Sequence, residues 1–298
     1  MTGHAPFPPF LRRAVPMGTG AMSILDIGDQ ARPVDLIWCH ATGFNAQTYL
    51  PALLPLGEHL RILAVDLRGH GQTSLPADPK RLRSWRRYGD DVVALLGAMD
   101  IRHPVTLAGH SMGGATALTV ARMASTRVKA LALFDPVILQ KRAYQIAAIL
   151  GSNGFIFRKS PMVTSALRRR ASFASVDAAF ATYRKRSAFQ TWPDDALRAY
   201  VDGGFATDAD GVHLTCAPAW EAATFRGAMS VNLWRDLERL RIPVTILRAD
   251  NGSTCALRDG DPLAKLPGRS VQTIAGSSHF LPIERPELLR ETLLKACQ

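Results

Sequence analysis

The sequence predicts an α/β fold built around a mostly parallel central sheet. Short, continuously apolar segments recur along the chain, and helical patterns with apolar residues at three-and-four spacing lie between them. Continuous apolar strands are typical of a buried parallel sheet, and their alternation with helices predicts right-handed crossovers. The 298 residues suit one such domain with an insertion, and a content of 47% hydrophobic residues excludes wholesale disorder.

The first half of the chain carries most of the predicted sheet. The start, through Arg13 and on to Gly20, is rich in proline and glycine and is expected to wrap loosely. The strands predicted after it lie at Met22–Ile27, Asp35–Cys39, Arg61–Val65, Val105–Ala108 and Val128–Phe134. The helices predicted between them lie at Ala46–His59, Trp85–Met99 and Met112–Ala124.

The alternation of strand and helix stops after Pro136. From there to Leu240 the patterns are helical or irregular, with aromatic residues dispersed through them. Two further strands and a closing amphipathic helix are predicted at Val244–Leu247, Ser270–Ile274 and Pro286–Ala296. The sequence therefore predicts a helical insertion, residues 139–240, that interrupts one core made of residues 1–138 and 241–298.

The chain is strongly basic, with a formal net charge of +11. Its arginines form short clusters, such as Arg81, Arg83, Arg86 and Arg87, and again Arg168, Arg169 and Arg170. They are not interleaved with aromatic residues along one segment, so we interpret them as a solvated face and expect no nucleic-acid partner. Asp90 and Asp91 are likewise expected on a solvated helix face.

Cysteine usage and hydropathy predict the setting of the protein. The four cysteines lie far apart without CxxC spacing, at Cys39, Cys216, Cys255 and Cys297. The start of the chain lacks the order of charged, apolar and small residues of a signal peptide, so we expect a reducing, cytoplasmic setting. No apolar run approaches the roughly 18 residues that suggest a membrane span. The sequence leaves the oligomeric state open.

The most specific motif is Gly109-His110-Ser111-Met112-Gly113-Gly114. It follows a predicted strand and opens a predicted helix, which is the context of a nucleophile elbow. Glycines are needed there because the turn strains the backbone and brings strand and helix close together. Ser111 Oγ is therefore expected to stand above the sheet as a nucleophile, beside a helix N-terminus that favours developing negative charge.

A serine hydroxyl needs a base at neutral pH, and histidine has the pKa for that task. His279 lies in Gly276-Ser277-Ser278-His279-Phe280, a loop between the last predicted strand and the last helix. Such a loop is expected at the carboxyl edge of the sheet, where ligands bind in open α/β sheets. His110 is expected to point away from Ser111, and His40 and His70 to make local hydrogen bonds. We therefore assign His279 as the base.

These motifs, in this order, resemble the α/β-hydrolase superfamily over nearly the whole chain. His40-Ala41-Thr42-Gly43-Phe44 resembles the family's His-Gly oxyanion loop, and Asp66-Leu67-Arg68-Gly69-His70-Gly71 resembles its D-x-R-G-H-G turn. In that turn Asp66 and Arg68 are expected to hold the loop. The resemblance implies a sheet of the α/β-hydrolase type, with a helical cap inserted after the sixth strand.

The resemblance also implies acyl chemistry that needs neither a metal nor a cofactor. Haloalkane dehalogenases and epoxide hydrolases of this fold are disfavoured, because they use aspartate where this chain has Ser111. By resemblance, the backbone N–H groups of Met112 and Thr42 form the oxyanion hole. Because Ala41 replaces the usual glycine, the choice between the Thr42 and Gly43 amides stays open.

The acid of the triad has two candidates. The family usually carries it after the strand predicted at Val244–Leu247, where this chain has Asp250 two residues before the expected position. Some relatives place it directly after the preceding strand, where this chain has Phe134-Asp135-Pro136. The spacing from Ser111 resembles that of dehalogenase-like members, so we favour Asp135 and keep Asp250 as the alternative.

The insertion is expected to cover the site and to provide a mostly apolar pocket. Trp192, Phe189, Trp220 and Phe225 are candidates to line it, and packing within the cap is their alternative role. The predicted function is a cofactor-independent serine hydrolase that cleaves carboxylic esters of small to medium hydrophobic substrates. The alternatives are a C–C bond hydrolase acting on vinylogous diketones and a small-ligand binding protein on a hydrolase scaffold.

Overall fold

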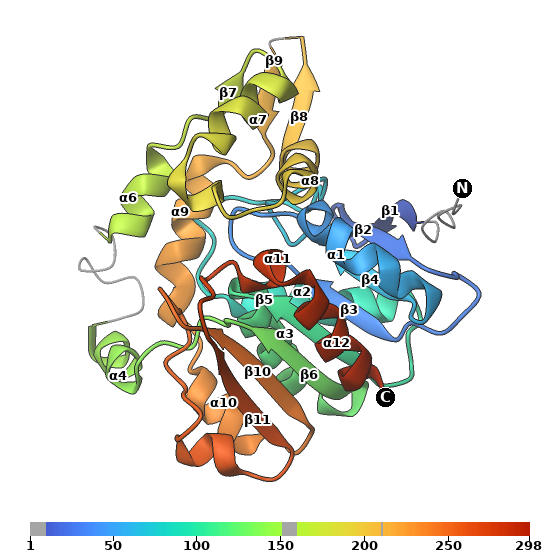
Figure 1. Cartoon of the computed structure of the whole chain (residues 1–298), viewed down its shortest axis with the longest axis vertical. Coiled ribbons are helices and arrows are strands. Elements are labelled where there is room, and N and C mark those ends of the chain that lie inside the picture. The colour runs from blue at the N-terminus through green and yellow to red at the C-terminus, as the bar shows by residue number, and fades with distance from the viewer. Residues whose placement is uncertain (1–9, 151–159, 210) are drawn as a thin grey trace.

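The structure is a computed structural model that describes residues 10–150, 160–209 and 211–298 (Figure 1). Its central sheet consists of β1 (Phe10–Pro16), β2 (Ala21–Ile27), β3 (Leu36–Cys39), β4 (Ile62–Val65), β5 (Val105–His110), β6 (Val128–Phe134), β10 (Val244–Ala249) and β11 (Arg269–Ile274). The spatial order is β1-β2-β4-β3-β5-β6-β10-β11. Only β2 runs against its neighbours, so the sheet is mostly parallel, as the sequence predicts.

The expectation that the start of the chain wraps loosely is wrong for Phe10–Pro16, and its part on residues 1–9 lies outside the described residues. β1 is a regular edge strand, paired with β2 from Phe10 opposite Ile27 to Pro16 opposite Ala21. Most of its side chains are exposed, so it lacks the apolar run on which the other strand predictions depended. Polar contacts fix it instead, because Arg12 and Arg13 bond to buried carboxylates at 2.9 and 2.8 Å.

Helices cover both faces of the sheet. One face carries α2 (Arg86–Ala98), α3 (Met112–Met123) and α10 (Leu233–Arg239), and the other carries α1 (Leu50–Leu53) and α12 (Pro286–Cys297). Side chains alternate along β3 between the two buried clusters, Ile37 and Cys39 facing the first and Leu36 and Trp38 the second. Burial on both faces explains why these strands read as continuous apolar runs.

The prediction of a single continuous helix at Ala46–His59 is wrong. The segment is divided into 3-10 turns at Ala46–Tyr49 and Leu54–Glu58 with the one-turn α1 between them. Pro51 and Pro55 stand at the starts of the second and third pieces. Because proline has no N–H to donate, each one interrupts the helical ladder.

The segment between β6 and β10 contains helices and, against expectation, a small antiparallel sheet. Besides α10, its helices are α4 (Lys141–Leu150), α6 (Pro161–Leu167), α7 (Val176–Arg184), α8 (Asp194–Gly204) and α9 (Pro218–Arg226). Its strands are β7 (Ser172–Phe173), β8 (Phe205–Asp208) and β9 (Gly211–Leu214), in the order β7-β9-β8. These strands are too short to give a recognisable alternating pattern, so the expectation of only helical or irregular structure is wrong.

Figure 1 shows α6 to α9 and the small sheet at one end of the core, and α10 back against the main sheet. The remaining elements are α11 (Leu281–Glu284) and the 3-10 turns at Ser125–Arg127, Ser187–Phe189, Gly227–Met229 and Pro262–Lys265. No helix in the ranges given above has the length and apolarity needed to cross a membrane.

Candidate active site

Ser111 occupies the sharp turn between β5 and α3. Its φ of 55° and ψ of −117° are strained for a residue with a side chain. Close packing explains the glycines around it: a Cβ on Gly113 would lie 2.0 Å from the Cys39 carbonyl oxygen, and one on Gly109 would lie 2.4 Å from the Gly113 backbone. The Ser111 N–H donates to the Phe134 carbonyl at 3.0 Å, which ties the turn to β6.

His279 lies between Ser111 and Asp135. Its Nε2 is 3.0 Å from Ser111 Oγ, and its Nδ1 is 2.6 Å from Asp135 Oδ2. The three residues follow β5, β6 and β11, so all of them stand at the carboxyl edge of the parallel strands. The His279 side chain is 23% exposed and can meet a ligand, whereas the Asp135 side chain is fully buried.

The buried Asp135 carboxylate is surrounded by donors. Besides His279, it accepts from the Ala249 N–H at 2.9 Å, the Ser253 hydroxyl at 2.5 Å and the Thr254 N–H at 2.9 Å. Burial alone would raise the pKa of Asp135, but the hydrogen bond and charge of His279, with these further donors, hold that pKa below its ordinary value. Asp135 therefore stays ionised beside the imidazole.

The structure does not bring Asp250 to His279. Asp250 is exposed, and its Oδ2 accepts from the Gly276 N–H at 3.2 Å. The loop after β10, where the family usually carries the acid, instead supplies Ser253 and Thr254 as donors to Asp135. Sequence reasoning missed this role of the two residues, because their partner lies more than a hundred positions earlier in the chain.

His110 is a site residue whose role sequence reasoning also missed. It is fully buried, with Nε2 2.7 Å from the His279 carbonyl oxygen and Nδ1 2.7 Å from the Tyr49 hydroxyl. A carbonyl only accepts, so Nε2 donates to it and Nδ1 accepts from Tyr49. Burial, together with the charge of His279, lowers the pKa of His110 to about 3, which keeps the ring neutral. His110 thus holds the backbone of the residue that faces Ser111.

Two buried histidines fix the loop that carries Thr42 and Gly43. His40 Nε2 accepts from the Leu67 N–H at 2.9 Å, and His70 Nε2 accepts from the Gly43 N–H at 3.1 Å. Burial lowers the pKa of His40 to about 4 and, with the charge of His40, that of His70 to about 3, so both remain neutral acceptors. Because the Gly43 amide already donates to His70, the Thr42 amide is the remaining candidate of the two for the second oxyanion donor.

The D-x-R-G-H-G turn holds these loops in place, as expected. Asp66 is fully buried, and its carboxylate accepts from the Ala46 N–H at 2.8 Å and from the Gln72 N–H at 3.0 Å. Arg68 bonds to Asp91 through Nε at 2.7 Å and Nη2 at 2.6 Å. Asp91 is therefore buried in an ion pair, and its expected place on a solvated helix face is wrong; the apolar pattern of α2 gave no sign of this partner.

A cavity of about 990 Å³ adjoins the site. Phe44, beside the oxyanion loop, and Phe280, beside His279, line it from the core, and Phe189 and Phe225 line it from the inserted segment. The other two aromatic candidates pack instead. Trp220 donates from Nε1 to the Arg68 carbonyl at 3.0 Å, and the Trp192 ring lies 5.4 Å from that of Phe44.

One wall of this cavity carries a largely buried ion pair, so the expected apolar pocket is apolar only in part. Arg169 Nη1 lies 2.9 Å from Glu221 Oε2, and the guanidinium also donates to the hydroxyls of Tyr183 and Tyr200. A Cβ on Gly43 would lie 2.5 Å from Glu221 Oε1, so the pair rests directly on the oxyanion loop. Burial opposes the charge of Arg169, but Tyr200 and Glu221 keep its pKa well above its ordinary value.

Sequence comparison decides the family. The model described as the alpha/beta hydrolase family matches residues 36–292. The chain belongs to the alpha/beta hydrolase family. This match confirms the resemblance to the α/β-hydrolase superfamily, and the matched residues include the segment between β6 and β10.

Individual relatives have low sequence identity to this chain. This α/β hydrolase is 24% identical over 287 residues to the 2-(acetamidomethylene)succinate hydrolase of Mesorhizobium japonicum, covering 94% of this chain and 92% of that protein. It is 24% identical over 272 residues to 3-oxoadipate enol-lactonase 2 of Acinetobacter baylyi, covering 90% and 89%. The crystal structure of E-2-(acetamidomethylene)succinate hydrolase superposes with a TM-score of 0.77 at 22% identity, over 97% of this chain and 99% of that chain. This structural superposition shows that the two chains share the same fold.

Proposed function

We propose that this α/β hydrolase is a serine hydrolase that acts through an acyl-enzyme, with Ser111 as nucleophile, His279 as general base and Asp135 as the acid that orients the imidazole. The observation that carries the proposal is the continuous row of hydrogen bonds from Ser111 Oγ through both ring nitrogens of His279 to Asp135. Both separations lie within the reach that proton transfer and orientation require.

The reaction follows from this row. His279 Nε2 takes the proton of Ser111 as Oγ attacks the substrate carbonyl, and the Thr42 and Met112 N–H groups stabilise the tetrahedral oxyanion. Each such donor is worth about 3 kcal/mol in the transition state. His279 then protonates the leaving group, and afterwards activates the water that hydrolyses the acyl-enzyme. Asp135 holds the Nδ1–H and stabilises the imidazolium without taking its proton.

We propose carboxylic esters as the substrates, with the small to medium acyl or alcohol part held in the cavity beside Phe44 and Phe280. The inserted segment, 139–240, then serves as a cap, because its side chains form the outer wall of that cavity. The aromatic side chains favour apolar substrate parts. A small-molecule substrate, rather than a nucleic acid, is the partner that this cavity suits.

Cysteine chemistry supports the cytoplasmic setting that belongs to this proposal. All four cysteines are free and buried. Burial raises the pKa of the Cys39 and Cys255 thiols to about 12, so both remain protonated and unreactive at neutral pH.

A second candidate keeps the same three residues but changes the substrate. The relatives named above act, by their names, on a substituted succinate and on an enol-lactone. Arg169 is already paired with Glu221, but the cavity wall also carries the exposed Arg168 and Arg186, whose charges favour a substrate with a carboxylate over a purely hydrophobic one. Cleavage of a carbon–carbon bond in a vinylogous diketone is the further alternative, since it uses the same nucleophile and base.

A substrate panel tests these choices. We expect wild type to release a burst of p-nitrophenol from p-nitrophenyl butyrate, and Ser111→Ala to lose at least about 1,000-fold in kcat. Normal ester turnover by Ser111→Ala would overturn the mechanism. Activity confined to a lactone bearing a carboxylate, or to a ring-fission dienoate, would reassign the substrate. Tight ligand binding with no acyl-enzyme from any of them would favour the binding protein.

A further inference from the structure

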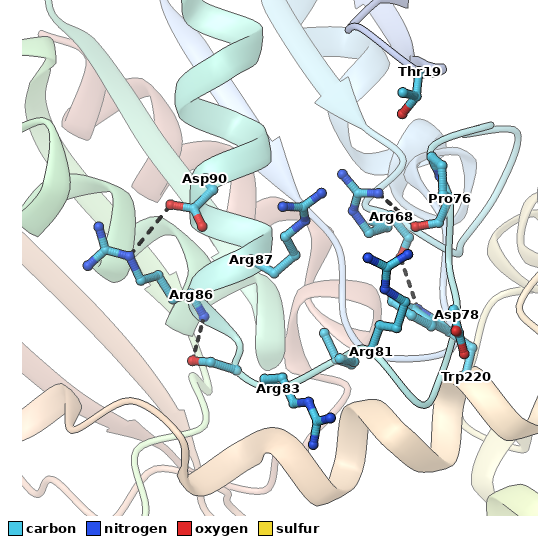
Figure 2. A pocket seen from close by; sticks show the side chains of 12 residues that line it. Thr19, Arg68, Pro76, Asp78, Arg81, Arg83, Arg86, Arg87, Asp90 and Trp220 are labelled. Carbon is cyan, nitrogen blue, oxygen red and sulfur yellow. Dashed lines mark hydrogen bonds and ion pairs between the residues drawn. The ribbon is translucent and has the colours of Figure 1, made fainter.

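A second hollow lies away from Ser111. A cavity of about 590 Å³ is lined by the segment from Pro76 to Arg87 together with Arg68 and Trp220 (Figure 2). A neighbouring cavity of about 420 Å³ shares Leu82 and Arg83 with it, and the two adjacent cavities together are called the groove below. Neither cavity includes Ser111, Asp135 or His279 in its lining, and neither shares a lining residue with the cavity beside Phe44 and Phe280. The groove is therefore distinct from the candidate active site.

The groove is lined mainly by cations. Its basic side chains are Arg68, Lys80, Arg81, Arg83, Arg86, Arg87 and Arg226, against the two carboxylates of Asp78 and Asp90. Figure 2 shows the guanidinium groups of Arg68, Arg81 and Arg87 near one another, with Arg83 and Arg86 pointing away from them. Arg81, Arg83, Arg86 and Arg87 are exposed, as expected of a solvated face, and they line a concave surface.

Buried contacts anchor the segment that lines the groove. Arg68 is only 5% exposed, and besides its two bonds to Asp91 it donates to the Pro76 carbonyl at 2.7 Å. Leu82 and Trp85 are buried, and Trp85 donates to the Ser230 hydroxyl at 2.8 Å and to the Thr224 carbonyl at 2.7 Å. The exposed side chains that flank Leu82 therefore project from an anchored segment.

The local carboxylates leave much of this charge uncompensated. Asp91 pairs with Arg68 and lies 3.8 Å from Arg87, and Asp90 lies 3.6 Å from Arg86. The Asp78 carboxylate accepts from the Lys80 backbone N–H. Over residues 10–150, 160–209 and 211–298, Arg81, Arg83 and Arg226 have no ion-pair partner. Converging like charges raise the free energy of the empty groove, and a bound anion removes that repulsion.

We propose that this groove binds an anion with two linked phosphate groups, the chemistry shared by free diphosphate and by a nucleoside diphosphate. The planar fork of arginine matches phosphate oxygens in pairs. The larger cavity has the volume of an ordinary small-molecule site, which is about 300 to 1,000 Å³. Because the two cavities share Arg83, linked phosphates place one charge centre in each.

Calorimetric titration with pyrophosphate at fixed ionic strength tests the proposal. The groove variant is Arg81→Gln/Arg83→Gln. The control is Arg241→Gln/Arg258→Gln, which removes the same charge from exposed positions outside the groove. We expect the groove variant to weaken pyrophosphate binding at least about tenfold and the control to change it less than about twofold, because only the first removes paired contacts to phosphate. Ester turnover, where wild type shows it, is expected to be unchanged in both variants.

The other arms identify the ligand or reject the site. Orthophosphate is expected to bind more weakly than pyrophosphate, because it engages one cavity only. Tighter binding of ADP than of pyrophosphate indicates a nucleoside diphosphate, and equal binding indicates the free diphosphate. Equal weakening in the groove and control variants, absence of pyrophosphate binding, parity between orthophosphate and pyrophosphate, or preferential binding of a DNA duplex would each overturn the proposal.

Discussion

Asp135 shows how single hydrogen bonds decide the state of a buried group. A buried carboxylate without partners costs several kcal/mol. Here Ala249, Ser253, Thr254 and His279 all donate to it, so the ionised form is retained in the interior. Asp250 remains in water and needs no such arrangement. The donors, more than the position in the chain, decide which carboxylate serves His279.

A pair of isosteric variants distinguishes the role of Asp135 from that of Asp250. Asp135→Asn is expected to lower kcat by about 1,000- to 10,000-fold, because the amide no longer holds the imidazole in the tautomer that accepts the Ser111 proton. Asp250→Asn is the control and is expected to leave kcat within about twofold. Steady-state ester kinetics measure both. The assignment fails if Asp250→Asn is the variant that loses activity.

Tyr49 acts on the reaction only through other residues. Tyr49→Phe removes the hydroxyl that donates to His110 Nδ1, so the ring that holds the His279 backbone loses its second anchor. We expect kcat to fall about tenfold with KM unchanged, the pattern of a group that positions the base. Tyr144→Phe removes another buried hydroxyl, one that accepts from the Leu139 N–H, and is expected to leave kcat unchanged. Equal kcat in both variants would contradict this role.

At the scale of elements, the turn between β5 and α3 combines strain with close packing. Ser111 keeps a backbone conformation that is unfavourable for a side-chain-bearing residue. The turn persists because β3, β5, β6 and α3 surround it, and the Ser111 carbonyl accepts from both Ala115 and Val137. The elements thus stabilise a conformation that the isolated segment would not adopt.

Two glycine substitutions measure this packing. Gly113→Ala is expected to destabilise the protein by more than about 3 kcal/mol, because the new methyl group meets the Cys39 backbone, which cannot move away. Gly97→Ala, at an exposed position near the end of α2 with no atom within 4 Å of the new carbon, is expected to stabilise by about 0.5 to 1 kcal/mol. Urea unfolding compares them, and equal stability of the two variants would contradict the packing argument.

At the scale of the whole molecule, burial decides what could be predicted from the sequence. The inner strands are buried on both faces and were found from their apolar runs. The edge strand β11 is only partly buried and was found from the glycine before it, whereas β1, at the other edge, is mostly exposed and was missed. Ser111 and His279 stand in motifs and were found. The contact between His110 and the His279 carbonyl joins residues 169 positions apart, and only the folded chain brings them together.

Buried histidines also make the stability of the whole molecule depend on pH. The folded pKa values of His40, His70 and His110 are lowered by burial, to about 4, 3 and 3. A histidine in the unfolded chain has a pKa of about 6.5. As the pH falls below that value, these three histidines become protonated in the unfolded chain while they stay neutral in the folded chain. Stability is therefore full above pH 6.5 and declines below it.

Urea unfolding between pH 5 and 7.5 measures this decline. If the unfolded chain binds three more protons than the folded chain, the free energy of unfolding falls by up to about 4 kcal/mol per pH unit below about pH 6. The loss is expected to continue toward the folded pKa values. A free energy of unfolding that does not change between pH 5 and 7 would show that these rings are protonated in the folded protein.

The central claim is that Ser111, activated by His279, attacks the substrate. Its most direct test is peptide mass spectrometry after exposure to a fluorophosphonate, which traps an activated serine covalently. The account expects one adduct, on the peptide that contains Ser111, and expects none in Ser111→Ala and slow labelling in His279→Ala. Labelling of another residue, or of Ser111→Ala at the wild-type rate, would contradict it.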